Sequence, residues 1–343
     1  DAIKQVIDVV SDDIESLAEA GDYEIIRDNL RSDALLEMIV DVAPYFRTPG
    51  ALGFDPNLTF DLAGNARLGI AFSAETTGFS MEMFTPNREE GEEFKNDYKG
   101  EILDILPNDV AGYYGSTDLS NFMNEYLVEM LSIPKLQEKN VNALTLQEEF
   151  NISLEEDIMS WMRGEYTFVY LDRKKDDTAL IFKVDNPKQV AEKLKKIEPA
   201  ISRIATALSK EAGSNFSFQQ SDTSPLGPIR YMPIEGTSNY FLNYGFRDKL
   251  LIMATSRDAI DTLFDDKLDG PALPNSRKYK LVFENVNVEE TAGSAYVDGK
   301  LFVEFMELLG LDLVFFERHI VGLGLETQRL ERGTKVVGAI PLI

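Results

Sequence analysis

The chain of 343 residues contains no cysteine, one histidine and one tryptophan. Without cysteine there is no disulfide framework and no thiolate-based zinc, iron–sulfur or nucleophile chemistry. A single histidine excludes a histidine-rich metal site and leaves at most one imidazole base. No run of about 18 apolar residues is present, so the sequence predicts no membrane-spanning helix. No signal peptide is visible, and the start at Asp1 rather than at methionine suggests a processed or trimmed N-terminus.

Positive charge is also scarce. The chain has 34 Lys and Arg against 59 Asp and Glu, which gives a formal net charge of −25. Such a chain repels nucleic-acid phosphates and anionic lipid, so we expect no nucleic-acid partner. Residues 1–150 carry 10 basic and 30 acidic side chains, against 24 and 29 in residues 151–343. This asymmetry indicates either an interaction surface or simply a strongly solvated one.

The composition that remains is that of a globular protein, with 44% hydrophobic and 27% charged residues. A single hydrophobic core rarely serves so long a chain, so we expect two lobes. The first is an acidic helix–hairpin lobe over residues 1–100, which the C-terminal segment 286–343 could complete. The second is a central α+β domain over residues 101–285.

Apolar spacing and turn residues predict the elements of both lobes. Residues 3–19 have the apolar period of an amphipathic helix, and a second helix is expected at 32–46. A hairpin is expected at 66–85 and another at 165–185, and Asn186-Pro187 opens the clearest helix of the chain. Further strands are expected at 110–116, 215–221, 229–234, 239–246, 249–255 and 278–284, a helix at 299–309, and two strands after His319.

The order helix, strand, strand recurs at 33–85, 118–185 and 299–343. We therefore predict an α+β fold whose antiparallel sheets are built from repeated strand–helix–hairpin modules, with the helices packed on one face. Strands that neighbour one another in sequence usually pair, which is why hairpins favour antiparallel sheets.

No coherent catalytic set emerges from the sequence. His319 lacks a nucleophile and an orienting group at recognisable positions, and no phosphate-binding loop or dinucleotide-binding glycine motif is present. The closest match to a calcium loop is Asp265, Asp266 and Asp269, which are weak candidate metal ligands because the loop ends in Pro271. We predict no catalytic residues and no cofactor.

Three segments resemble motifs of a known family. Leu106-Pro107-Asn108-Asp109 with Tyr113 and Asp118-Leu119 resembles its LP-x-D-x-x-x-Y … DL segment. Asp157-Ile158 leading to Trp161 and Gly164-Glu165 resembles its D-L/I … W-x-G-E segment, although Met162-Arg163 makes the spacing here longer. Asp185-Asn186-Pro187-Lys188 resembles its V-x-D-P-x-K-A-E segment.

From about Ser16 to its end, the chain is similar to the bacterial domain-of-unknown-function 3352 family. These proteins are exported or membrane-anchored and have no assigned activity, so the resemblance implies no catalytic residue. It implies a location outside the cytoplasmic membrane, secreted or anchored by an N-terminal segment that lies upstream of this sequence.

We therefore expect a non-enzymatic, extracytoplasmic cell-envelope protein that acts as a binding or scaffold component, with a protein or another envelope component as its partner. One alternative is a carrier that holds an apolar ligand between sheet and helices, which requires an enclosed apolar pocket. A second alternative is a hydrolase that uses carboxylates, which requires two acids facing each other across a cleft, one with a raised pKa.

Overall fold

A computed structural model describes residues 22–41, 67–86, 96–120, 123, 127, 143–172, 177–208, 216–221, 228–234, 240–264, 271–284, 286, 288–308 and 318–343. The chain divides into two compact units. Unit 1 comprises Asp1–Asn96, Leu281–Ala292 and Val314–Ile343, and unit 2 comprises Asp97–Lys280 and Gly293–Leu313. Each unit combines helices with an antiparallel sheet, so the expected α+β class is confirmed.

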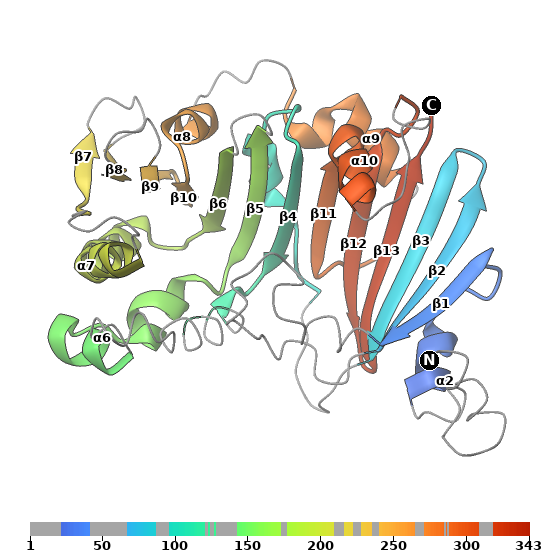
Figure 1. Ribbon diagram of the computed structural model, residues 1–343, viewed down its shortest axis with the longest axis horizontal. Coiled ribbons are helices and arrows are strands. Elements are labelled where there is room, and N and C mark those ends of the chain that lie inside the picture. The colour runs from blue at the N-terminus through green and yellow to red at the C-terminus, as the bar shows by residue number, and fades with distance from the viewer. Residues whose placement is uncertain are drawn as a thin grey trace. The chain divides into compact units, whose positions relative to one another are not determined.

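The described sheet of unit 1 is built from two hairpins and one further strand. Its order is β1 (Leu36–Asp41), β2 (Arg67–Glu75), β3 (Gly78–Pro86), β13 (Gly333–Pro341) and β12 (Gly322–Leu330) (Figure 1). All neighbours pair antiparallel. Two residues separate β2 from β3 and two separate β12 from β13, as in tight hairpins.

The two faces of this sheet differ in composition. We call the face that contains Gly69, Ala71 and the residues opposite them the covered face, because helix α2 (Asp22–Asn29) packs on it. Ile26 of α2 is fully buried there with Ala71 and Phe84. We call the face that contains Ile70, Phe72 and the residues opposite them the open face.

The described sheet of unit 2 is larger and also antiparallel throughout. Its strands follow the order β11 (Gly293–Asp298), β4 (Gly112–Thr117), β5 (Glu165–Asp172), β6 (Asp177–Lys183), β10 (Leu250–Ala254), β9 (Tyr240–Arg247), β8 (Ile229–Pro233) and β7 (Gln219–Ser221).

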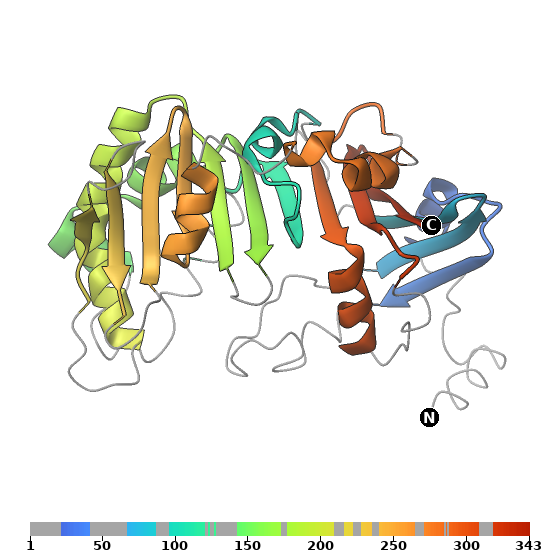
Figure 2. The same cartoon turned by 90° about the horizontal axis from the view of Figure 1, so that it is seen from above.

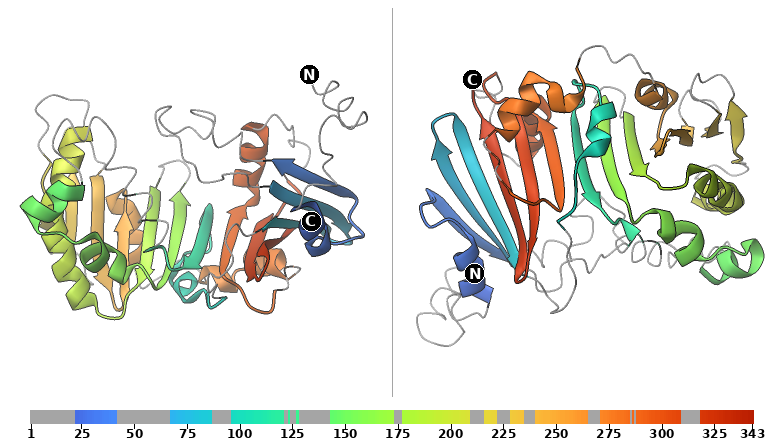
Figure 3. Two further views of the ribbon diagram at one scale, coloured as in Figure 1. Left: turned by 90° about the horizontal axis from the view of Figure 1, so that it is seen from below. Right: turned by 180° about the vertical axis from the view of Figure 1, so that it is seen from behind.

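Helices lie on both faces of the unit 2 sheet. Tyr244 of β9 donates its hydroxyl to Glu198 of α7 (Pro187–Leu208), whereas the next residue, Gly245, lies against Phe264 of α8 (Arg257–Phe264). Adjacent residues of a strand point to opposite faces. Figure 2 shows α8 in front of the strands, and the left view of Figure 3, from the opposite side, shows α7. The expectation of helices on one face only therefore does not hold in this unit.

The other helical elements of unit 2 are short. They are η1 (Glu101–Ile105), α6 (Ala143–Phe150), η2 (Leu154–Ile158), η3 (Met159–Trp161), η4 (Leu273–Asn275) and α10 (Gly299–Leu308). The boundary between the units falls inside α9 (Arg277–Phe283). None of the helices described here is both long and apolar enough to cross a membrane.

Two element predictions are wrong. The segment expected as a helix at 32–46 contains β1, and the segment expected as a strand at 278–284 contains most of α9. Because β1 stands where the first module needed its helix, the helix–strand–strand order fails at 33–85. The helix expected at 3–19 lies outside the described residues.

Candidate functional site

Unit 2 contains a cleft of about 590 Å³ beside the first turn of α7. Its walls come from residues 97–101, from the connection between η3 and β5, and from the end of β6 with the start of α7. Two of the segments that resemble family motifs line it, through Trp161, Gly164 and Glu165 and through Asp185 and Asn186. The cleft is thus the part of unit 2 in which two of the three motif segments meet.

The wall that carries Trp161 is held by a set of local hydrogen bonds. Ser153 accepts a bond from the backbone N–H of Glu156 at 3.2 Å, and its own N–H donates to the Asp157 carboxylate at 2.8 Å. This reciprocal arrangement resembles a capping box and fixes the start of η2. The indole N–H of Trp161 donates to the carbonyl of Asp157 at 2.8 Å, and its ring packs edge-on against Phe182.

Asp157 also ties this wall to α7. Lys196 donates to its carboxylate at 2.6 Å. Burial raises the pKa of Asp157, but the hydrogen bonds from Lys196 and Ser153 outweigh that effect, so its pKa lies below the ordinary value. The carboxylate is therefore ionised and engaged in holding η2 against α7.

Glu165 is the most unusual titratable group of the cleft. It is buried, and its carboxylate accepts the backbone N–H of Ile102 in η1 at 3.0 Å. Burial raises the pKa of Glu165, and the nearby Glu101 carboxylate raises it further, while the bond from Ile102 opposes both. The sequence names Glu165 as part of a family motif, but it could not show the burial of its carboxylate, because only the fold places the start of β5 under η1.

The cleft meets the requirements of a carboxylate hydrolase only in part. Glu165 has the raised pKa, but its carboxylate already accepts a hydrogen bond from the backbone N–H of Ile102 in η1. The second acid, Glu101, is ion-paired with Lys183, and hydrogen bonding from Lys183 lowers its pKa. A glycosidase needs a second carboxylate free to act on substrate or on water. In the described residues both carboxylates instead hold parts of the protein together: Glu165 binds the backbone of η1, and Glu101 pairs with Lys183.

The basic side chains near the cleft are engaged as well. Arg163 pairs with Glu155, and Lys193 donates to the hydroxyl of Ser160 at 2.9 Å. Farther along α7, Arg203 pairs with Glu149 of α6. The basic face of this helix thus meets acidic and polar groups of its own unit.

A buried polar cluster fixes α7 to the sheet. Arg230 of β8 makes two bonds to Glu198, at 2.7 and 2.5 Å, and Tyr244 donates to the same carboxylate at 2.7 Å. Burial raises the pKa of Tyr244, and the adjacent Glu198 raises it further. Three hydrogen bonds from two partners, one of them a cation, indicate that this buried carboxylate is a clamp rather than a reactive group.

The remaining motif residues also have packing roles. Leu106 is fully buried, and its carbonyl accepts the N–H of Leu273 at 2.9 Å. The hydroxyl of Tyr113 lies 2.8 Å from that of Ser294 and 3.1 Å from that of Tyr279. Asn186 caps α7 by accepting the N–H of Gln189 at 3.2 Å.

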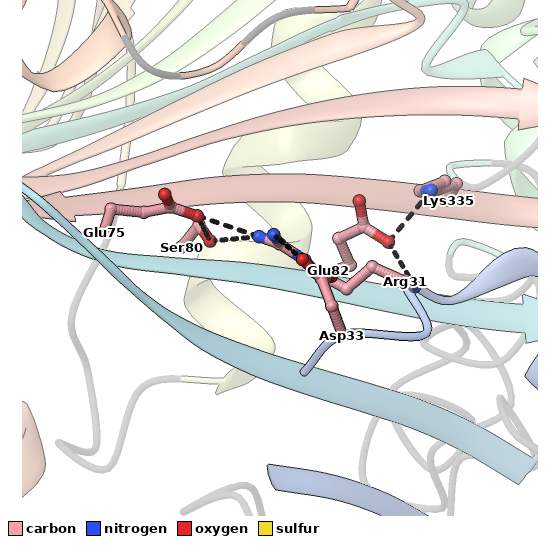
Figure 4. A network of polar contacts seen from close by, with 6 residues as sticks. All are labelled: Arg31, Asp33, Glu75, Ser80, Glu82 and Lys335. Atoms are coloured by element: carbon pink, nitrogen blue, oxygen red, sulfur yellow. Dashed lines mark hydrogen bonds and ion pairs between the residues drawn. The ribbon is translucent and has the colours of Figure 1, made fainter. Parts of the chain in front are cut away.

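Unit 1 has a separate polar network at the edge of its covered face (Figure 4). Arg31 donates to Asp33 at 2.8 Å, to Glu75 at 2.9 Å and to Ser80 at 2.8 Å. Its backbone N–H donates to Glu82 at 3.0 Å, and Lys335 pairs with the same carboxylate. The bonds from Arg31 lower the pKa of Asp33, and those from Ser80 and Arg31 lower that of Glu75. The network fastens the α2–β1 connection to the β2–β3 hairpin.

The open face of unit 1 has the opposite character. Four of its side chains are exposed: Leu36 by 50%, Met38 by 37%, Val40 by 40% and Phe79 by 44%. Register places further apolar side chains between and beside them, namely Leu68, Ile70, Phe72, Met81, Met83, Val336 and Ile340.

These residues span four strands, and the longest strands have nine residues. With strands about 4.8 Å apart and a rise of about 3.4 Å per residue, this face covers roughly 500 Å² of sheet. An apolar patch of that scale is comparable with the largest patch on a typical monomeric protein, and such patches often bind a partner. The helices described in unit 1 do not cover it, because they lie on the other face.

In the part of the chain that the structure describes, the candidate residues from sequence do not come together in a site. The weak metal candidates Asp265, Asp266 and Asp269 lie outside the described residues. His319 is exposed, and its Nδ1 lies 2.8 Å from the carbonyl oxygen of Ile343. Within the described residues no cluster of three or more histidine or carboxylate side chains could hold a metal ion.

Comparison with known proteins identifies the family. The model of the family described as "Protein of unknown function (DUF3352)" matches residues 1–309. The chain belongs to this family. The three DUF3352-like segments all lie within the matched range, and here their side chains cap helices, fill the core and hold the walls of the cleft.

A search of curated proteins gave no match. Among solved structures, crystal forms III and I of TP0453 are 12% and 11% identical to this DUF3352 chain, with TM-scores of 0.34 and 0.33. They cover 68% and 69% of this chain and 77% of the TP0453 chain. TM-scores this low do not establish a common fold.

Proposed function

We propose that this protein is a non-enzymatic binding or scaffold component of the cell envelope, located outside the cytoplasmic membrane. The observation that carries the proposal is the open face of unit 1. Although the chain has a net charge of −25, this sheet face is apolar and its central positions carry no charge. Such a face costs free energy in water and favours association.

The chemistry of the cleft supports a non-enzymatic role. Several of its charged side chains are already engaged within the protein, namely Glu165 with the backbone of η1, Lys183 with Glu101, and Arg163 with Glu155. An enzyme site instead holds groups whose partners arrive with the substrate. The cleft also gives no support to a carrier of apolar ligands, because Lys, Asp and Glu side chains line it.

The open face defines the kind of partner. The partner should present a contact surface that is apolar at its centre, because the open face has no charged side chain between Val40 and Ile340. Around that apolar centre the partner should carry Lys and Arg, because this chain, with a net charge of −25, attracts cationic side chains and repels anionic ones. We therefore propose a protein of the envelope with such a surface.

Affinity capture from detergent-solubilised envelope extracts tests this proposal with a matched pair of variants. Phe79→Glu places a charge on the open face, and Phe168→Glu makes the same change at a side chain of unit 2 that is 47% exposed. The wild type and Phe168→Glu should retain the same partner, and Phe79→Glu should lose it. If no partner is retained at any salt concentration, or if only Phe168→Glu loses it, the proposal fails.

A further inference from the structure

Strand β1 forms an open edge of the unit 1 sheet. In the part of the chain that the structure describes, it pairs with β2 and stands last in the strand order. Edge strands are normally protected by charged side chains, above all lysine, or by proline, bulges or a covering element. The sequence of β1, LEMIVD, contains neither lysine nor proline, and its register with β2 is regular from Leu36 to Asp41. Its two charged residues, Glu37 and Asp41, are both acidic and restrict the registers in which the edge can pair. This edge therefore has the features of a strand-pairing surface.

The tight β2–β3 hairpin indicates which backbone groups of β1 face outward. The pair Glu75 and Gly78 closes its two-residue turn, and such a closing pair is hydrogen-bonded. Along antiparallel strands, residues that share hydrogen bonds with the neighbouring strand alternate with residues that do not. Counting back from Glu75, Ile70 and Phe72 share none with β3, so their backbone groups point toward β1. Their partners, Met38 and Leu36, face inward, so the N–H and C=O groups of Glu37 and Ile39 point away from the sheet.

The charges of β1 select one register for pairing with a second copy of itself. In antiparallel pairing centred on Met38, Glu37 of each copy lies opposite Ile39 of the other. In pairing centred on Ile39, Glu37 lies opposite Asp41, and like charges directly opposite destabilise a sheet. Among registers that pair both Glu37 and Ile39 with residues of β1, only the one centred on Met38 avoids facing carboxylates.

We propose that two copies of this protein associate through antiparallel pairing of β1 with β1, centred on Met38. The pairing satisfies the outward groups of Glu37 and Ile39 in both copies. It also sets Met38 beside its equivalent and Leu36 beside Val40, on the open face. The apolar face of one copy thereby continues into that of the other, and the exposed area of Leu36, Met38 and Val40 decreases.

The proposed contact is small and carries like net charge on both sides. Edge pairing buries less area than the roughly 1,200 Å² of a standard interface, so the dimer forms reversibly and in proportion to concentration. Each copy has a net charge of −25, so the copies repel one another at long range. Added salt screens that repulsion and should increase the dimer fraction.

The absence of cysteine allows a direct test in the full chain. Opposed residues that do not share hydrogen bonds have Cα atoms about 4.5 Å apart, within the range of a disulfide. Met38→Cys should therefore give, under mild oxidation, a product of twice the 38.5 kDa chain mass. Glu37→Cys is the matched control, because its equivalents are offset by two residues and should not link.

Sedimentation velocity of the unlinked protein provides a second measurement. Glu37→Pro removes an outward N–H but no bond to β2, and so should abolish the dimer while the chain stays folded. Glu37→Ala should keep the dimer. A monomer at every concentration, or equal linking of Met38→Cys and Glu37→Cys, would overturn the inference. It concerns the edge of β1 rather than the partner of the open face, so either proposal can fail alone.

Discussion

At the scale of single residues, the side chains that mark the family here stabilise the fold. Ser153 and Asp157 cap η2, Trp161 bonds to the same turn, and Glu165 binds the backbone of η1. The sequence showed these residues as a pattern, and it placed the start of α7 at Asn186-Pro187 correctly. It could not show the burial of Glu165, which depends on contacts between segments that lie 63 residues apart.

The raised pKa of Glu165 predicts a defined pH dependence. The folded protein holds this proton more tightly than the unfolded chain, so the stability that Glu165 contributes is complete below the unfolded pKa of about 4.3 and is lost as pH rises through the folded pKa. Glu165→Gln, which cannot ionise, should match or exceed the wild type in free energy of unfolding at pH 7.5.

That advantage should disappear near pH 4, as urea denaturation at the two pH values will show. Glu165→Ala is the control, because it leaves the N–H of Ile102 without its partner and should lose about 1–3 kcal/mol. If Glu165→Gln were as unstable as Glu165→Ala at pH 7.5, the proposed effect of burial would be wrong.

The buried Glu198 carboxylate should matter far more than an exposed one. Glu198→Ala leaves the partly buried Arg230 and the buried hydroxyl of Tyr244 without their partner, so we expect a loss of about 3 kcal/mol in the free energy of unfolding, toward the lower end of the range for buried pairs. Tyr244→Phe should cost about 1 kcal/mol. The exposed pair of Arg257 and Asp261 is the matched control, and Asp261→Ala should cost less than about 1 kcal/mol. Equal losses at Glu198 and Asp261 would contradict the clamp.

At the scale of elements, long-range pairing decides where local pattern is ambiguous. Around β1, the spacing of Leu35, Leu36, Ile39 and Val40 fits a helix, while Leu36, Met38 and Val40 fit a strand equally well. Pairing with β2 selects the strand. For α9, the signal overlooked in the sequence is Ser276 as an N-cap: its hydroxyl accepts the N–H of Tyr279 at 3.2 Å, which favours a helix over the expected strand. Hairpin 66–85 and helix α7 were predicted correctly because turn residues and apolar period agree there.

The contact between α2 and the sheet gives a test at this scale. A Cβ on Gly69 would lie 2.2 Å from Cγ2 of Ile26, so β2 needs glycine where the helix crosses it. Gly69→Ala should lower the free energy of unfolding by about 1–3 kcal/mol through overpacking. Ile26→Ala removes the obstructing group, so the double variant should lose less than the sum of the single losses. Strictly additive losses would show that α2 does not pack as described.

At the scale of the whole molecule, each unit is assembled from segments that are distant in sequence. Strands β2 and β3 of unit 1 are completed by β12 and β13 from the other end of the chain. Periodicity alone assigned alternate residues of the 66–85 hairpin to opposite faces. It could not show that the described helices of unit 1 leave one of those faces uncovered, because that depends on where α2 and α9 pack.

The central claim is that the open face of unit 1 meets a protein partner in the envelope. Site-specific photo-crosslinking in intact cells tests it most directly, with the probe at Phe79 in one variant and at the similarly exposed Phe168 of unit 2 in the other. We expect a discrete cross-linked product from position 79 and none of that mass from position 168. No product from position 79, or the same product from both positions, would contradict the claim.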